Sequence, residues 1–203
     1  MKDILTTLRL VILSLIVCCV LYPAVLLAFG QIVVPWKANG SLMRHDTGTI
    51  LGSAQLAQAF TQPRYFWPRP SAVDYNASAT GGSNLSPTHP LLAQRAQALI
   101  GRYGLREDQR LPADLVAASG SGMDPHITLA AARFQAPRVA SARHLPLERI
   151  SQLIEQHMDV PTLRVFGGEP VVNVLRLNIA LDVQSRLNPL DVQSRYIESS
   201  HDG

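Results

Sequence analysis

Residues 10–29 form an uninterrupted run without a charged side chain, and this run limits the possible folds of the chain more than any other feature. At about 1.5 Å rise per residue, a helix over this run spans roughly the 30 Å hydrocarbon core of a bilayer. The run is longer than the roughly 7 to 15 apolar residues of a cleavable signal peptide, and no clear small-x-small cleavage pattern follows it. We therefore predict a retained transmembrane helix over residues 10–29 in contact with lipid; the alternative is a cleaved secretory signal. Pro23 either bends this helix or sits where a lost hydrogen bond is tolerable.

The charges that flank the apolar run predict its orientation. Lys2 and Arg9 stand before the run beside Asp3, and Lys37 and Arg44 follow it. Positive charges close to a membrane helix favour the cytoplasmic side, and the short amino-terminal side carries them more densely. We therefore expect a cytoplasmic N-terminus, with the remainder of the chain outside the membrane.

The remainder of the chain predicts one mixed α+β domain. The expected organisation is a short cytoplasmic N-terminus over residues 1–9, the helix over 10–29, an extracytoplasmic domain over 30–183 and a polar tail over 184–203. Periodicity and capping signals predict helices at 54–60, 89–103, 128–143 and 147–158, with strands in 41–53 and 171–183. Pro137 should kink or split its helix, because it removes a backbone donor. The tail repeats the sequence L-D-V-Q-S-R at 181–186 and 190–195, a local duplication to which we assign no function.

Composition excludes several classes of protein. At 203 residues the chain is too short for a pump with its own phosphorylation and nucleotide domains. The formal net charge is +3 without a basic run, so nucleic acid is not an expected partner. Lys2 and Lys37 are its only lysines, and neither ends a Gly-rich phosphate-binding loop. Cys18 and Cys19 both lie inside the apolar run, so the predicted exported part needs no disulfide.

Residues 65–84 read Y-F-W-P-R-P-S-A-V-D-Y-N-A-S-A-T-G-G-S-N, which has neither helical nor strand periodicity. Its two prolines fix φ and restrict the residues before them, so a shaped loop is predicted. Two interpretations stay open for its side chains: an exposed cation-π cluster at a protein interface, or aromatics that pin the loop to the core. The side chains to which both interpretations apply are those of Tyr65, Phe66, Trp67, Arg69 and Tyr75.

Residues 119–126, S-G-S-G-M-D-P-H, bring a hydroxyl, a carboxylate and an imidazole close together in sequence. The spacing differs from the nucleophile elbow of a hydrolase, so we favour a glycine-rich turn in which Asp124 caps a helix that begins near Pro125 or Ile127. No metal site is predicted, because Asp124 and His126 lack nearby ligand partners. Asp46 begins a D-T-G-T turn similar to a P-type ATPase phosphorylation motif without its lysine, and we interpret it as a hairpin turn.

Several motifs in order resemble one family: R-P-S-A at 69–72, Y-N at 75–76, G-G-S-N at 81–84 and S-G-S-G-M-D-P-H at 119–126. The motifs R-V-A-x-A-R at 138–143 and V-N-V-L-x-L-N at 172–178 support the same resemblance. They are similar to the C subunit of the Kdp-type potassium-transporting P-type ATPase.

That resemblance implies a non-catalytic, single-span accessory subunit of a bacterial inner-membrane complex. Its partners would be an ATP-hydrolysing subunit and a potassium-channel-like subunit. The family is described as a catalytic chaperone that raises the ATP affinity of the pump subunit, with ATP as the implied ligand and a glutamine near the nucleotide, for which Gln135 is the candidate. Because the predicted topology separates Gln135 from cytoplasmic ATP, an alternative is that the outer domain braces the complex or covers the potassium entrance.

The motifs also supply candidate partner contacts. These are Arg69, Ser71, Tyr75, Asn76, Gly81, Gly82, Ser83, Asn84, Ser119, Ser121 and Asp124. Two other classes stay open: a generic membrane-anchored binding module of the cell envelope, and an exported hydrolase that uses Ser121.

Overall fold

A computed structural model describes residues 2–45, 48–105, 110–160 and 168–184. Asp46, for which a hairpin turn is predicted, and the second copy of the tail repeat lie outside these residues. The chain divides into two compact units, Met1–Leu42 and Met43–Gly203, and each is described by itself.

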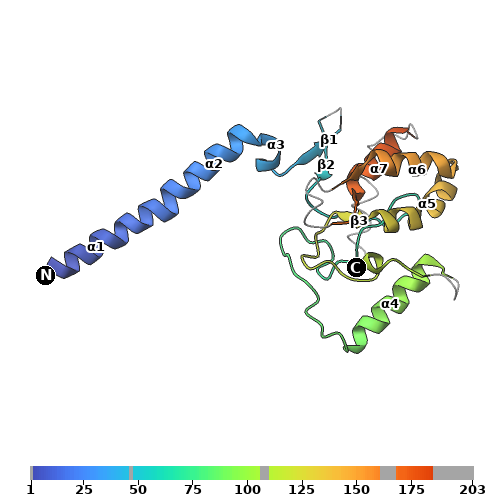
Figure 1. Cartoon of the computed structure of the whole chain (residues 1–203), viewed down its shortest axis with the longest axis horizontal. Coiled ribbons are helices and arrows are strands. Elements are labelled where there is room, and N and C mark those ends of the chain that lie inside the picture. Colours follow the sequence, from blue (N-terminus) through green and yellow to red (C-terminus); the bar gives the residue numbers. More distant parts are fainter. Residues whose placement is uncertain (1, 46–47, 106–109, 161–167, 185–203) are drawn as a thin grey trace. The chain divides into compact units, whose positions relative to one another are not determined.

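The first unit is a long helix followed by a short one (Figure 1). Its elements are α1 (Lys2–Leu15), the π-helical turn η1 (Ile16–Leu21), α2 (Tyr22–Val33) and α3 (Pro35–Ala38). The first three form one apolar helix over Lys2–Val33, long enough to cross a membrane, and none of its apolar window is buried within the protein.

The π-helical turn stands directly before Pro23. The Tyr22 N–H donates to the Val17 carbonyl, five residues back, instead of four. Proline has no N–H, and its ring crowds the carbonyl four residues before it, so a wider turn at this point accommodates it. The apolar run thus stays helical through Pro23.

The second unit is a mixed α+β domain, as predicted. Its elements are β1 (Leu42–Arg44), β2 (Ile50–Ser53), α4 (Pro90–Tyr103), η2 (Ala113–Leu115), β3 (His126–Thr128), α5 (Leu129–Arg143), α6 (Leu147–Gln156), β4 (Met158–Asp159), β5 (Val171–Asn173) and α7 (Val174–Gln184). Strands β1 and β2 form a two-stranded sheet, and a three-stranded antiparallel sheet has the order β3-β5-β4.

The core lies where α5, α6 and α7 pack with the three-stranded sheet (Figure 1). Alanines on the buried face of α5 let the backbones approach closely, and Ile150 and Ile154 of α6 are fully buried. By contrast, α4 has no buried residue and stands apart from these three helices. Its last residue, Tyr103, attaches it to the domain through ring contacts with Trp67 and Phe134.

Capping chemistry places several helix ends where the sequence predicted them. His89 caps α4 through its Nδ1, and Gly104 ends the helix in the left-handed region at φ +61°. Pro146 precedes α6 as expected. Helix α5 begins after Thr128, whose hydroxyl accepts the Ala131 N–H.

Three predictions about local structure are wrong. Residues 54–60 are not helical, because Phe60 is buried in the core and the Ala57 N–H donates across to the Met123 carbonyl. Asp124 caps no helix, since its carboxylate accepts the His126 N–H at the start of strand β3. Pro137, which is exposed, does not split α5, because the helix is continuous around it; the alternative of a kink stays a prediction.

The expected strand over residues 171–183 is also wrong beyond its first three residues. The strand stops at Asn173, whose side-chain oxygen accepts the Arg176 N–H and so caps helix α7. Buried residues then recur with helical spacing at Val174, Leu177, Asn178 and Leu181. The β-branched residues in this segment misled the prediction, because tertiary burial outweighs strand propensity.

Candidate functional site: two paired loops

Two loops that the resemblance singled out lie side by side. We call the surface that residues 69–84 and 119–126 form the paired-loop face. An ion pair of 3.1 Å between Arg69 and Asp124 links the loops. The Gly81 N–H donates to the Ser121 carbonyl over 2.9 Å, which adds a backbone link. Motifs far apart in sequence therefore build one surface.

The two loops approach so closely that glycine is required at one contact. Gly122 has a φ of +70°, and a Cβ there would lie 2.6 Å from the Val73 side chain and 2.9 Å from the Gly81 carbonyl oxygen. A Cβ on Gly82 would lie 3.0 Å from the Gly120 carbonyl oxygen. Side chains at these points would force the loops apart, which explains why the motifs carry glycine.

Asp74 and Tyr75 hold left-handed backbone conformations, with φ of +52° and +57°. Such conformations cost about 1–3 kcal/mol each in non-glycine residues and persist only where the surroundings determine them. Here the Ser71 hydroxyl accepts the N–H groups of Val73 and Tyr75, and the Tyr75 hydroxyl donates to the Arg69 carbonyl over 2.9 Å. Burial raises the pKa of Tyr75 to about 12, so the hydroxyl stays a donor at physiological pH.

Asp124 is the charged centre of the paired-loop face. The hydrogen bond from the His126 ring, the His126 backbone N–H and the Arg69 guanidinium lower the pKa of the Asp124 carboxyl, against an opposing effect of burial. Both side chains of the Arg69–Asp124 pair are about one-third exposed or less, at 27% and 31%. The pair therefore orders the surface without closing it to a partner.

The aromatic residues at the start of the loop belong to the core. Tyr65, Phe66 and Trp67 are 4%, 0% and 6% exposed, which favours the interpretation that they pin the loop to the domain. We call residues 62–67 the aromatic strap. It has no strand partner, so its buried backbone groups need other hydrogen-bond partners.

Two amide side chains supply those partners. Gln135 of α5 accepts the Trp67 N–H over 2.8 Å and donates to the Trp67 carbonyl over 3.0 Å. Asn178 of α7 does the same for Phe66, over 2.9 and 3.0 Å. Because Gln135 and Asn178 lie on different helices, the strap is hydrogen-bonded to both α5 and α7.

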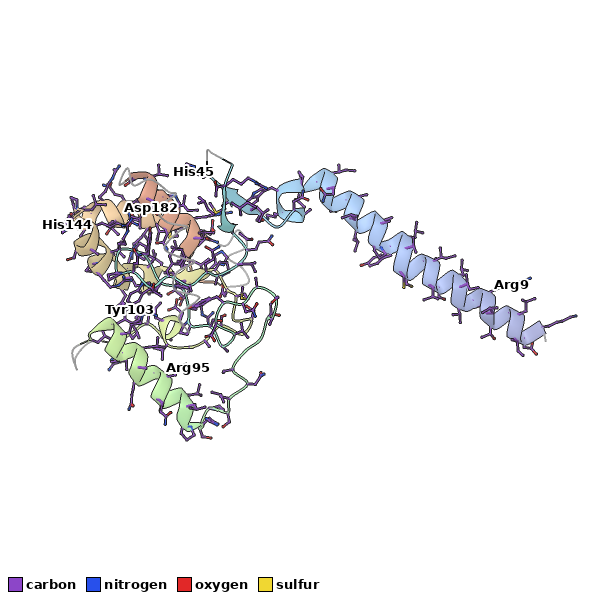
Figure 2. All side chains as sticks on the ribbon, turned by 180° about the vertical axis from the view of Figure 1, so that it is seen from behind. Arg9, His45, Arg95, Tyr103, His144 and Asp182 are labelled. Atoms are coloured by element: carbon purple, nitrogen blue, oxygen red, sulfur yellow. The ribbon has the colours of Figure 1, made fainter. Side chains whose placement is uncertain are left out.

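Charged side chains complete the attachment of the strap. Arg143 donates to the Arg64 carbonyl over 2.7 Å and pairs with Asp182 over 2.7 Å. Asp182 also accepts the Tyr65 hydroxyl, and Figure 2 shows its position on α7 within the domain. Arg138 donates to the Pro63 carbonyl and to the Gln135 side-chain oxygen. The strap is thus held from both sides along its length.

The cation-π contacts of the domain come from other arginines than the predicted one. The Arg102 and Arg138 guanidinium carbons lie 3.9 and 3.8 Å from the centre of the Trp67 ring. Two guanidinium groups fit this close to one centre only from opposite faces of the ring. Burial lowers the pKa of Arg138 to about 10, and Arg69 pairs with Asp124 instead of an aromatic ring.

The geometry gives the candidate residues two kinds of position. Ten of the eleven candidate partner contacts are exposed or half-buried on or beside the paired-loop face, and Ser119 is buried beneath it, with its N–H donating to the Pro70 carbonyl. Gln135 is 1% exposed, and its amide is occupied by the strap. The nucleotide contact of Gln135 stays a prediction, and such a contact would require these hydrogen bonds to open.

Ser121, the serine considered as a hydrolase nucleophile, has no catalytic partners among the described residues. The Ser121 hydroxyl accepts the Met123 N–H over 3.1 Å, as expected in a turn. Within the described part of the chain, no imidazole or carboxylate bonds to this hydroxyl, and the His126 ring faces Asp124 instead. The Ser121 hydroxyl therefore stabilises the turn.

Sequence reasoning missed the residues that hold the strap. Arg138, Arg143 and Asn178 lie inside the two motifs that supported the resemblance, so a signal existed. The sequence did not indicate that these side chains share one target, the backbone of the aromatic strap. The strap residues lie 68 and 112 positions away from the amide side chains that bind them.

Together, an apolar helix long enough to span a bilayer and one α+β domain define a class: a single-pass membrane protein with an extramembrane domain. Residues 4–183 match the KdpC family, described as "K+-transporting ATPase, c chain". The chain belongs to this family of potassium-transporting ATPase subunits.

Individual relatives agree with the family match. A potassium-transporting ATPase KdpC subunit of Parvibaculum lavamentivorans is 47% identical, over 90% of this chain and 97% of the relative. That of Synechocystis sp. is 44% identical, over 89% and 98%. That of Burkholderia vietnamiensis is 50% identical, over 79% and 86%. The similarity therefore covers both the membrane helix and the domain.

Proposed function

We propose that this chain is the non-catalytic accessory subunit of an ATP-driven potassium uptake complex, and that its paired-loop face contacts another subunit of that complex. The observation that carries the proposal is the convergence of the family motifs on one face, fixed by the Arg69–Asp124 ion pair and the close contacts of Gly122. Rigid surfaces bind at a lower entropic cost than mobile ones, which suits a permanent subunit contact.

The proposed partners are an ATP-hydrolysing subunit and a potassium-channel-like subunit. In the proposed topology, the N-terminus is cytoplasmic and the domain lies outside the bacterial inner membrane. The flanking charges of Lys2 and Arg9 support it. A phosphatase reporter fused after Asp182 should be active. An inactive reporter would indicate the opposite orientation, with the domain in the cytoplasm.

In this proposal the chain acts as a catalytic chaperone that raises the ATP affinity of the hydrolysing subunit from a distance. Gln135 supports the indirect route, because its amide holds the Trp67 backbone in the core. The effect would pass from the domain through the membrane helices as a coupling free energy between two sites.

The test is the ATP dependence of hydrolysis by the purified complex with and without this chain. We expect the apparent affinity for ATP to rise when the chain is present and kcat to change less. ATP binding by the chain alone, saturable and lost in Gln135→Ala with an intact fold, would contradict the indirect route.

A further inference from the structure

A pocket of about 380 Å³ opens beside the paired-loop face. Its lining mixes apolar and polar side chains, and Asp74 is among them. The lining residues come from β2 and the segment after it, from the strained loop, and from the turn before β3. Leu51, Leu56, Ala57, Ala59, Ala77 and Met123 are apolar, and Ser53, Gln58, Asp74 and Tyr75 are polar. Pockets of this size, apolar with a few polar groups, are typical binding sites.

The Asp74 carboxylate has no partner in the described part of the chain. No ion pair or side-chain hydrogen bond to it occurs there, and the residue is exposed. Asp124, by contrast, pairs with Arg69 and His126. The pocket therefore combines apolar lining residues with one exposed carboxylate that has no ion-pair partner among the described residues.

The loop geometry holds Asp74 at this place. Asp74 and Tyr75 both have left-handed φ values, and the Ser71 hydroxyl and the Arg69 carbonyl fix the turn around them. Strained backbone of this kind is concentrated at binding sites, where it keeps a side chain in position before the ligand arrives. Here the side chain so positioned is a carboxylate.

We infer that this pocket receives an arginine or lysine side chain from a neighbouring subunit of the complex, which rests on the proposed function. The apolar stem of such a side chain would cover Leu56 and Met123, and its cationic head would meet the carboxylate of Asp74. A phosphate or another anion would be repelled by Asp74, and a purely apolar group would leave the carboxylate unpaired.

Three variants of the full-length chain test the inference. Asp74→Asn removes the charge and keeps the shape. Ala59→Phe places a ring at the exposed rim of the pocket and leaves Asp74 in place. Glu148→Gln removes a charge from the exposed start of α6, away from the pocket, and is the matched control.

Each variant is tagged, expressed with the other subunits and purified in detergent, and the retained subunits are measured against salt concentration. Because assembly would bury the charged hydrogen bond to Asp74, its loss should lower retention at least about tenfold for Asp74→Asn and Ala59→Phe, with Glu148→Gln equal to wild type. Near-UV circular dichroism of each variant verifies the fold.

The outcomes are distinguishable. If the wild-type chain retains no subunit, the proposed function fails. If wild type and both pocket variants retain the subunits equally, the pocket inference is overturned and the proposed function stands. Agmatine, a free guanidinium with an apolar stem, is titrated onto the full-length chain as well. Asp74-dependent binding of agmatine with unaffected assembly would identify a free small cation as the ligand and overturn the inference of a side chain from a neighbouring subunit.

Discussion

Replacing Gln135 with alanine should destabilise the domain strongly, because the side chain satisfies two buried groups of the Trp67 backbone. The hydrogen bonds measure 2.8 and 3.0 Å, and Gln135 is 1% exposed, so water cannot replace the lost partners without opening the core. A buried donor or acceptor left without a partner costs about 1–3 kcal/mol, and two such groups cost about 2–6 kcal/mol in total. At about 2–4 °C per kcal/mol for a domain of this size, the Tm should fall by about 10 °C.

The assay is thermal unfolding of the full-length chain in detergent, followed by tryptophan fluorescence, because Trp67 is 6% exposed in the folded domain. The matched control is Gln152→Ala on the exposed face of α6, which should shift the Tm by less than about 2 °C. Equal Tm shifts for the two variants would refute the stabilising role of the Gln135 hydrogen bonds to the Trp67 backbone. A lost ATP effect in Gln135→Ala indicates nucleotide contact only if its Tm is unchanged.

Further predictions concern the paired-loop face and its tyrosines. Arg69→Ala should lower retention of partner subunits. It should shift the Tm of the isolated chain by only about 2 °C, because partly exposed ion pairs contribute about 0–1 kcal/mol; a large Tm loss with intact assembly would contradict this. The pKa of Asp124 is depressed, so its contribution to stability is present above the ordinary value of 3.8 and is lost as pH falls through the lower folded-state pKa. Asp124→Asn should therefore flatten the acid limb of a plot of Tm against pH, and an unchanged limb would place the titrating group elsewhere. Tyr75 and Tyr103 have pKa values raised to about 12, so the stability they contribute is present below pH 10 and lost as pH rises through 12. Absorbance at alkaline pH should show late ionisation that Tyr75→Phe reduces, and ionisation near pH 10 would argue against its burial.

Local signals in the sequence predicted the parts of the fold that local chemistry determines. The long apolar run predicted the membrane helix, and the proline, glycine and periodic apolar residues around α4 and α6 predicted both helices. The capping role of Asn173 was missed because its segment is rich in β-branched residues, which favour a strand until the helical spacing of the buried residues is noticed.

The attachment of the aromatic strap was beyond local reasoning. Phe66 and Trp67 obtain backbone partners from side chains 112 and 68 residues away, so no short window contains both members of a pair. The contact of Arg69 with Asp124 has the same character, over 55 residues. The motifs indicated which residues matter, and only the fold shows what they contact.

The most direct test of the account is purification of the tagged full-length chain from its own membranes under potassium starvation, with identification of the proteins that accompany it. The account predicts recovery of a P-type ATPase subunit and a channel-like subunit in constant proportion, with both reduced for Arg69→Ala. A chain that purifies alone, folded and monomeric, would contradict the account and support a free-standing binding module of the cell envelope.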